Sequence, residues 1–187
     1  AVISMFIGDD LQAIVDAIVS GTAYKDHGRT KMNLGIPSVP TFTKDTTDRN
    51  RTSPFAFTGN KFEFRMVGSS QNIALANIMI NTAVAKVFRD FADRLSASAD
   101  FETDTKALIK DTLKAHKRII FNGNGYSSKW PVEAEKRGLL NLKTSVDAFS
   151  CLTEQKNIDL FTEFGVMSEV EIRSRQDILF ENYCKII

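Results

Sequence analysis

The stretch DRNRTSPFAFTGNKFEFR at residues 48–65 decides how this chain is interpreted. Its end alternates in character and predicts a strand over residues 62–67. Successive side chains of a strand point to opposite faces, which gives this strand an apolar face and a charged face. The apolar face holds Phe62, Phe64 and Met66, and the charged face holds Lys61, Glu63, Arg65 and Val67.

Glu63 and Arg65 are predicted to stand side by side on the charged face, about 6–7 Å apart along the strand. A carboxylate next to a guanidinium, backed by two Phe and a Met, suits a site for a metal ion and an anionic group. The alternative is a surface strand that carries an ordinary cross-strand ion pair, which is a common arrangement. Spacing alone leaves both interpretations open.

A wider pattern favours the first interpretation. Asn50 and Arg51 precede the Glu63–Phe64–Arg65 triplet, and Asn72 follows it. This pattern resembles the C-terminal signature of the glutamine synthetase catalytic domain. The amino-acid sequence of residues 50–71 resembles the large type III class of that family. A second stretch, FNGNGYSSKWPVEAEKRGLLNLKTSVDA at residues 121–148, resembles the type III C-terminal region. The resemblance covers nearly the whole chain, although the second stretch suggests no particular chemistry.

The resemblance implies an ATP-dependent glutamate–ammonia ligase that works through a γ-glutamyl phosphate, with Mg²⁺ or Mn²⁺ as cofactor. By that resemblance Glu63 is a metal ligand, and a hard carboxylate oxygen suits either ion. Arg65 corresponds to the arginine that holds the glutamate substrate and the transferred phosphate, for which a planar fork is better than a lysine. Arg51 corresponds to an arginine near the ATP phosphates. Lys61 corresponds, more weakly, to a basic residue that contacts the nucleotide in relatives.

The chain also departs from the family pattern. Many relatives carry a second arginine five residues after the first, where this chain has Ala56, and Arg49 is a candidate substitute for it in nucleotide binding. The usual Asp-Pro before the following helix is replaced by Gly68 and Ser69. Asn72 keeps its place but is followed by Ile73 and Ala74 in place of Pro-Tyr, and a structural role is expected for it. These departures affect individual contacts expected with the ATP phosphates, and the family resemblance stands.

Composition narrows the classes of partner. The 187 residues include 24 Lys and Arg against 23 Asp and Glu, so charge gives no argument for nucleic acid or an anionic membrane. Apolar runs are broken by charge before they reach membrane-spanning length. Cys151 and Cys184 have no metal or disulfide spacing, and we interpret them as reduced, half-buried thiols of a cytoplasmic protein.

Periodicity predicts a chain dominated by helices. A strand is expected at residues 2–7, followed by a helix to residue 20 capped by Asp9 or Asp10, and residues 21–60 are expected to be long loops. Ser70 is expected to cap a helix over residues 71–97 that is buried on most sides in its first half. Further helices are predicted at residues 101–119, 128–137, 145–151 and 154–164, and Ser168 with Glu171 forms a capping box for a last helix.

The predicted fold class is therefore α+β and mostly helical, a partial glutamine synthetase catalytic fold over residues 1–98 and a helical C-terminal extension over residues 99–187. The chain begins inside an apolar run, which suggests a truncated piece, and the isolated chain is expected to be inactive. The longer protein of which the chain is expected to be a piece is predicted to be a homo-oligomer that acts on glutamate and ammonia. Two alternatives remain, a free-standing helical interaction module and a γ-glutamyl ligase for another amine.

Overall fold

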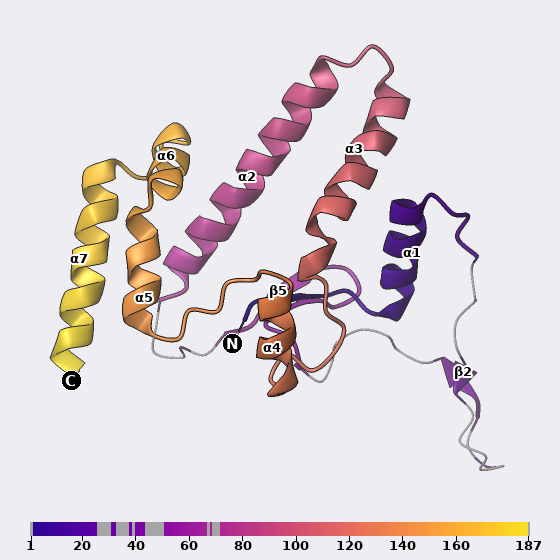
Figure 1. Cartoon of the computed structure of the whole chain (residues 1–187), viewed down its shortest axis with the longest axis horizontal. Helices are drawn as coiled ribbons and strands as arrows, with labels where there is room; N and C mark the ends of the chain where they lie inside the picture. Colours follow the sequence, from indigo (N-terminus) through magenta and orange to yellow (C-terminus); the bar gives the residue numbers. More distant parts are fainter. Residues whose placement is uncertain are drawn as a thin grey trace. The chain divides into compact units, whose positions relative to one another are not determined.

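A computed structural model describes residues 2–25, 31–32, 38, 40–43, 51–66, 68 and 72–186 of the chain. It is mostly helical with short strands, as the α+β prediction expected (Figure 1). The chain divides into two compact units, one of residues 1–67 and 105–141 and one of residues 68–104 and 142–187. These units are discontinuous in sequence. The predicted boundary between a catalytic part (residues 1–98) and a C-terminal extension (residues 99–187) stays a prediction. No helix among the described residues has the length and apolarity needed to cross a bilayer.

The first unit contains a three-stranded sheet in the order β1-β4-β5, formed by β1 (Met5–Phe6), β4 (Phe55–Phe57) and β5 (Phe62–Phe64). β1 runs parallel to β4, and β4 runs antiparallel to β5 with Ala56 opposite Glu63. Ile120 adds a parallel bridge to Met5, so this sheet joins three distant parts of the sequence. A separate pair is formed by β2 (Lys31–Met32) and β3 (Phe42–Thr43).

The sheet corrects several predictions. β5 ends at Phe64 instead of residue 67, β1 spans two residues of the predicted six, and the predicted loop region contains β2, β3 and β4. Strands of two or three residues are too short to give a readable alternation. The expected apolar backing is also wrong, because Phe62, Phe64 and Met66 are 48%, 39% and 49% exposed.

The helices of the first unit are α1 (Asp9–Ser20), α3 (Phe101–His116) from residue 105 onward, the 3₁₀ turn η1 (Lys117–Ile119) and α4 (Lys129–Lys136). The predicted helix over residues 101–119 is thus α3 followed by η1. Gly8 precedes α1 and no side chain caps it, so the predicted Asp cap is wrong. Asp9 and Asp10 lie in the first turn, where the helix dipole favours acidic groups.

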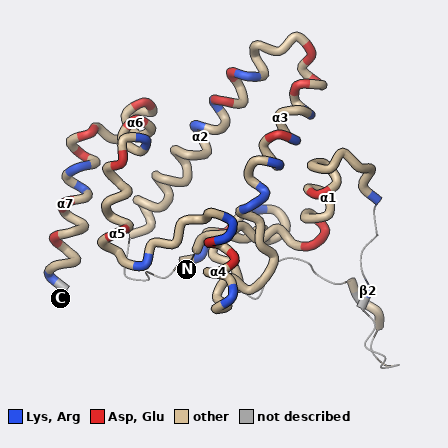
Figure 2. The backbone as a smooth tube through the Cα atoms, viewed as in Figure 1, with Lys and Arg blue, Asp and Glu red and all other residues tan. Residues whose placement is uncertain are grey.

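Basic residues recur along α3 and continue into η1 (Figure 2). Lys110, Lys114, Lys117 and Arg118 are all exposed. The Lys117 ammonium of η1 lies 2.6 Å from an Asp16 carboxylate oxygen of α1, and this ion pair connects η1 to α1.

The core of the first unit forms around Trp130, which is 1% exposed and packs with Val2 and Ala134. Its indole N–H donates to the Val2 carbonyl at 3.1 Å. Its ring stacks on Phe121 with 4.0 Å between ring centroids. Residues at opposite ends of the unit's sequence therefore meet at one tryptophan, which links residues 121–139 to the start of the chain.

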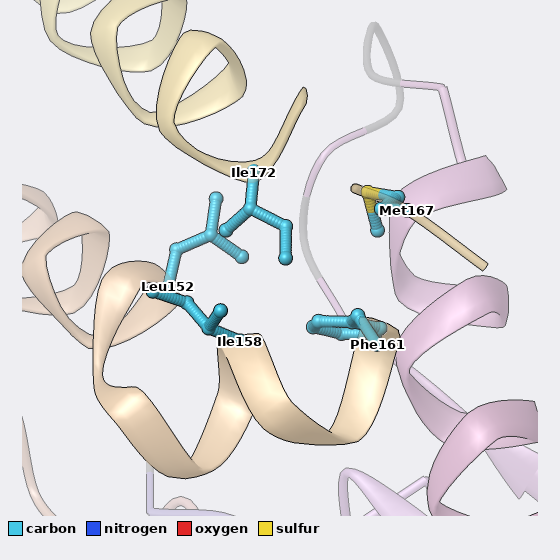
Figure 3. Close-up of a cluster of buried hydrophobic side chains, with 5 residues drawn as sticks. All are labelled: Leu152, Ile158, Phe161, Met167 and Ile172. Atoms are coloured by element: carbon cyan, nitrogen blue, oxygen red, sulfur yellow. The ribbon is translucent and has the colours of Figure 1, made fainter. Parts of the chain in front are cut away.

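The second unit is helical and comprises α2 (Ala74–Ser96), α5 (Ser145–Ser150), the 3₁₀ turn η2 (Cys151–Thr153), α6 (Gln155–Glu163) and α7 (Glu169–Ile186). Ser168 and Glu171 make the predicted capping box at the start of α7, with the Ser168 N–H donating to Glu171 Oε2 at 2.8 Å. The unit's core consists of five buried side chains (Figure 3), namely Leu152, Ile158, Phe161, Met167 and Ile172. Cys151 and Cys184 are both free thiols, and Cys184 is exposed instead of half-buried.

α2 contacts this core through a different face from the apolar stripe that its sequence predicts, which consists of Ile73, Ala76, Ile80, Val84, Val87, Phe91 and Leu95. Leu75 and Ile78 pack on the core, and Thr82 is the one buried side chain described for α2. The first half of the helix is not buried on most sides, because Ile73 is 71% exposed and Val84 is 44% exposed. The predicted cap Ser70 lies outside the described residues. The Asn72 carboxamide oxygen instead accepts the Ala74 N–H at 2.7 Å, which agrees with a structural role for Asn72.

Candidate functional site

A hollow of about 430 Å³ in the first unit is lined by Arg51, Glu63, Arg65, Met66 and Tyr126. Glu63 is the centre of β5, Arg65 directly follows this strand, and Arg51 precedes β4. Three of the five predicted site residues therefore share one surface. Lys61 extends toward Glu63 but is not part of the lining. Arg49, the fifth, lies outside the described residues.

An ion pair between Glu63 and Arg65 fixes the centre of the hollow. Arg65 Nε and Nη2 both donate to Glu63 Oε2, at 3.1 and 2.9 Å. The other carboxylate oxygen, Oε1, accepts from the Thr58 hydroxyl at 3.4 Å and lies 3.5 Å from Lys61 Nζ. Ala56, opposite Glu63 on β4, is fully buried, and Arg65 N–H donates to the Pro54 carbonyl at 2.7 Å. The pair thus rests on a fixed backbone.

The hydrogen bonds from Arg65 hold the pKa of Glu63 below its ordinary value, and Lys61 lowers it further. Glu63 is therefore ionised throughout the neutral range. Because its pKa is lower in the folded chain, the ion pair contributes stability above the carboxyl's unfolded pKa. This contribution is lost as pH falls through the folded pKa.

Replacing Arg65 with Gln is expected to raise the pKa of Glu63 toward its ordinary value. The physical reason is that the substitution removes the largest cause of the shift, the two charge-assisted hydrogen bonds. Carbonyl ¹³C NMR of side-chain-labelled glutamate measures this titration, with Glu63→Gln to assign the resonance. A Glu63 resonance that titrates at the same pH with and without Arg65 contradicts the described pair.

Arg51 has a φ of +57°, and it is the one non-glycine residue with positive φ among the described residues. Such a conformation costs about 1–2 kcal/mol for an L residue with a side chain, and it is commonly kept at functional sites. A neighbouring contact holds it in place, since Gly125 N–H donates to the carbonyl of the next residue, Thr52, at 2.7 Å. A Cβ at Gly125 would lie 3.0 Å from that oxygen, a tight contact, so this close approach favours glycine.

Replacing Arg51 with Gly is therefore expected to give a more stable chain than replacing it with Ala, by about 1 kcal/mol. Both variants remove the guanidinium, and only Gly removes the backbone strain. Urea unfolding of the two variants measures the difference in the free energy of unfolding. If Arg51→Ala proves equal to Arg51→Gly or more stable, position 51 is not left-handed.

Tyr126 and Met66 were not predicted as site residues. The strand ends at Phe64, so alternation stops and Met66 reaches the hollow instead of the opposite face. Tyr126 belongs to the 121–148 stretch, whose resemblance suggested no chemistry. The only sequence signal was the turn sequence Asn122–Gly125 just before it, which predicts a tight loop but not the loop's neighbour.

The implied divalent cation fits these residues only in part. Glu63 offers one carboxylate, and no cluster of three or more His, Cys, Asp or Glu side chains occurs within the described ranges. Mg²⁺ needs about six oxygen ligands in octahedral geometry. A closed metal site therefore requires ligands beyond those this hollow supplies.

Comparison with known proteins shows that the chain is similar to glutamine synthetases. Residues 104–187 match the glutamine synthetase C-terminal domain family. The whole chain is 45% identical to the type-3 glutamine synthetase of Dictyostelium discoideum over 190 residues, which are 26% of that protein. It is 44% identical to a glutamine synthetase of Butyrivibrio fibrisolvens, again over its full length and 27% of the relative. A glutamine synthetase of Bacteroides fragilis (strain YCH46) is 37% identical over 98% of the chain. The chain thus spans about a quarter of the length of these curated relatives.

Proposed function

Because this chain belongs to the glutamine synthetase family, we propose that it forms part of an ATP-dependent glutamate–ammonia ligase and supplies part of its phosphoryl-transfer site. One observation carries the proposal: Arg51, Glu63 and Arg65, the residues to which the resemblance assigned phosphate and metal roles, line the same hollow. A plain surface ion pair between Glu63 and Arg65 does not require Arg51 beside it.

In the proposed reaction, an oxygen of the glutamate γ-carboxylate attacks the γ-phosphorus of ATP and ADP leaves. Ammonia then attacks the γ-carbonyl carbon and phosphate leaves with that oxygen. The contribution of this chain is electrostatic, since guanidinium groups at Arg51 and Arg65 neutralise charge on the phosphoryl oxygens. Glu63 orients Arg65 through its two hydrogen bonds, and Lys61 adds positive charge at the rim.

Mg²⁺ or Mn²⁺ bound with ATP is part of this proposal, and it supplies further neutralisation of phosphate charge. Glu63 would be one of its ligands, and the remaining ligands come from outside the described residues. The parent is proposed to be a cytoplasmic homo-oligomer.

The exposed apolar surface of α2 favours a part of a larger assembly over a self-contained interaction module. Ile73, Val84, Val87 and Phe88 are 71%, 44%, 44% and 67% exposed. Exposed apolar residues that recur along one helix are typical of surfaces that contact other protein. An evolved free-standing module is expected to bury such residues in one defined oligomer.

The isolated 187-residue chain is expected to form no glutamine, whereas the full-length protein forms glutamine and phosphate from glutamate, ammonia and ATP. Two arginines and one carboxylate cannot by themselves enclose the reactants. A coupled ADP assay with direct detection of glutamine compares the two proteins, with Glu63→Ala in each as control. Glutamine formation by the isolated chain well above its Glu63→Ala control overturns the partial-site proposal. A full-length protein that uses another amine but not ammonia overturns the substrate assignment.

A further inference from the structure

The hollow has two chemically different sides. Arg51, Glu63 and Arg65 are ionic, whereas Met66 and Tyr126 offer a thioether and an aromatic ring. Met66 is 49% exposed and Tyr126 is 59% exposed. A ligand that carries only anionic groups, such as glutamate or phosphate, leaves this second side in water. A ligand with both phosphates and a planar apolar part occupies both sides.

We infer that Tyr126 is a nucleotide-binding residue, whose ring receives the base of ATP while Arg51 and Arg65 bind its phosphates. This inference rests on the proposed function and names a residue for the nucleotide subsite of that same hollow. In the part of the chain that the structure describes, the Tyr126 ring stacks on no other aromatic ring and lies under no guanidinium. More than half of its surface is exposed to solvent.

Two contacts tie the loop that carries Tyr126 to other parts of the first unit, and a third hydrogen bond lies within the loop itself. Asn122 Oδ1 accepts the N–H groups of Ile7 and Gly8, both at 3.0 Å, at the end of β1. Gly125 N–H donates to the Thr52 carbonyl, next to Arg51. Asn124 Oδ1 accepts the N–H of Tyr126 itself at 2.9 Å. The contact between Gly125 and Thr52 couples the position of Tyr126 to the strained backbone at Arg51.

An open aromatic ring beside arginines fits a nucleotide better than it fits the amino-acid substrate. Stacking of a base on an aromatic side chain contributes enough to change affinity by about 10-fold or more on alanine substitution. Such stacking needs the ring and not the hydroxyl group. Glutamate has no planar apolar group with which to use the ring.

The test compares the affinities of ATP and inorganic tripolyphosphate, measured by isothermal titration calorimetry on the full-length protein with Mg²⁺ present. For Tyr126→Ala we expect the affinity for ATP to fall about 10-fold, while the affinity for tripolyphosphate stays within about 2-fold. Tyr126→Phe and Tyr126→Trp keep a ring and are expected to keep ATP affinity within about 3-fold. Tyr24→Ala, a half-exposed tyrosine of the same unit that does not line the hollow, is the matched control.

Each other outcome overturns the inference in a recognisable way. If Tyr126→Phe loses as much ATP affinity as Tyr126→Ala, the hydroxyl group is what binds. If Tyr126→Ala weakens ATP and tripolyphosphate equally, Tyr126 acts on the phosphates. If neither affinity changes, Tyr126 lies outside the nucleotide subsite. Steady-state kinetics separate this from the proposed function, because a wild-type protein that forms no glutamine contradicts the ligase proposal, whatever the Tyr126 variants show.

Discussion

Replacing Glu63 with Gln is expected to lower kcat/KM for the proposed glutamine formation by the full-length protein by about 100-fold or more. The substitution removes a carboxylate charge that Arg65 contacts, since Arg65 Nε and Nη2 both donate to Glu63 Oε2. A neutral amide oxygen accepts these bonds more weakly, so the guanidinium is no longer fixed against the phosphoryl group. The loss is expected mainly in kcat, since the arginine is most needed when charge develops on the transferring group.

Steady-state kinetics at saturating ammonia, with ATP and glutamate varied in turn, measure the effect. Glu135→Gln is a matched control, because Glu135 is an exposed carboxylate of α4 in the same unit that does not line the hollow. The control is expected to keep wild-type activity. A Glu63→Gln enzyme within threefold of wild type contradicts the role given to this carboxylate.

Replacing Trp130 with Ala is expected to lower the free energy of unfolding by about 3–5 kcal/mol. The ring is 1% exposed, and its loss opens a cavity between Val2, Ala134 and Phe121. The Val2 carbonyl also loses its indole donor. Typical domains are stable by only about 5–15 kcal/mol, so this single change removes a large part of the total.

Urea unfolding followed by circular dichroism measures this loss, and Trp130→Phe separates its parts. The Phe variant keeps a ring against Phe121 but not the hydrogen bond, so a smaller loss is expected. Tyr126→Ala is the control for an exposed aromatic residue of the same unit, with an expected change within about 0.5 kcal/mol. If Trp130→Ala unfolds at the same urea concentration as Tyr126→Ala, the tryptophan does not hold this unit together.

The sequence predicted the charged side of the site better than its apolar side. Glu63 and Arg65 are two residues apart, and their side chains meet although the strand ends at Phe64. Met66 was assigned to the opposite face because the alternation was extended past Phe64, where the strand stops. Tyr126 could not be found from the sequence, because a loop has no periodicity. It reaches the hollow through contacts of Asn122 and Gly125 with residues more than 70 positions away.

In the helices too, the feature set by nearby residues was predicted correctly, whereas the face set by tertiary packing was not. The start of α7 and its capping box follow from nearby residues, and the prediction of that box is confirmed. α2 is apolar nearly all round in its first half, so the sequence offers several faces of similar hydrophobicity. Its packing partners decide among them, and Leu75 and Ile78 contact the core instead of the predicted stripe.

We propose that the hollow around Arg51, Glu63 and Arg65 serves phosphoryl transfer from ATP to the glutamate γ-carboxylate. The fate of a carboxylate oxygen tests it most directly. Glutamate labelled with ¹⁸O in its γ-carboxylate is incubated with the full-length protein, ATP and ammonia, and the released phosphate is analysed by mass spectrometry. We expect one ¹⁸O atom in phosphate for each glutamine formed, and we expect the rate of transfer to fall in the Glu63→Gln variant. Unlabelled phosphate, or label recovered in AMP, contradicts it.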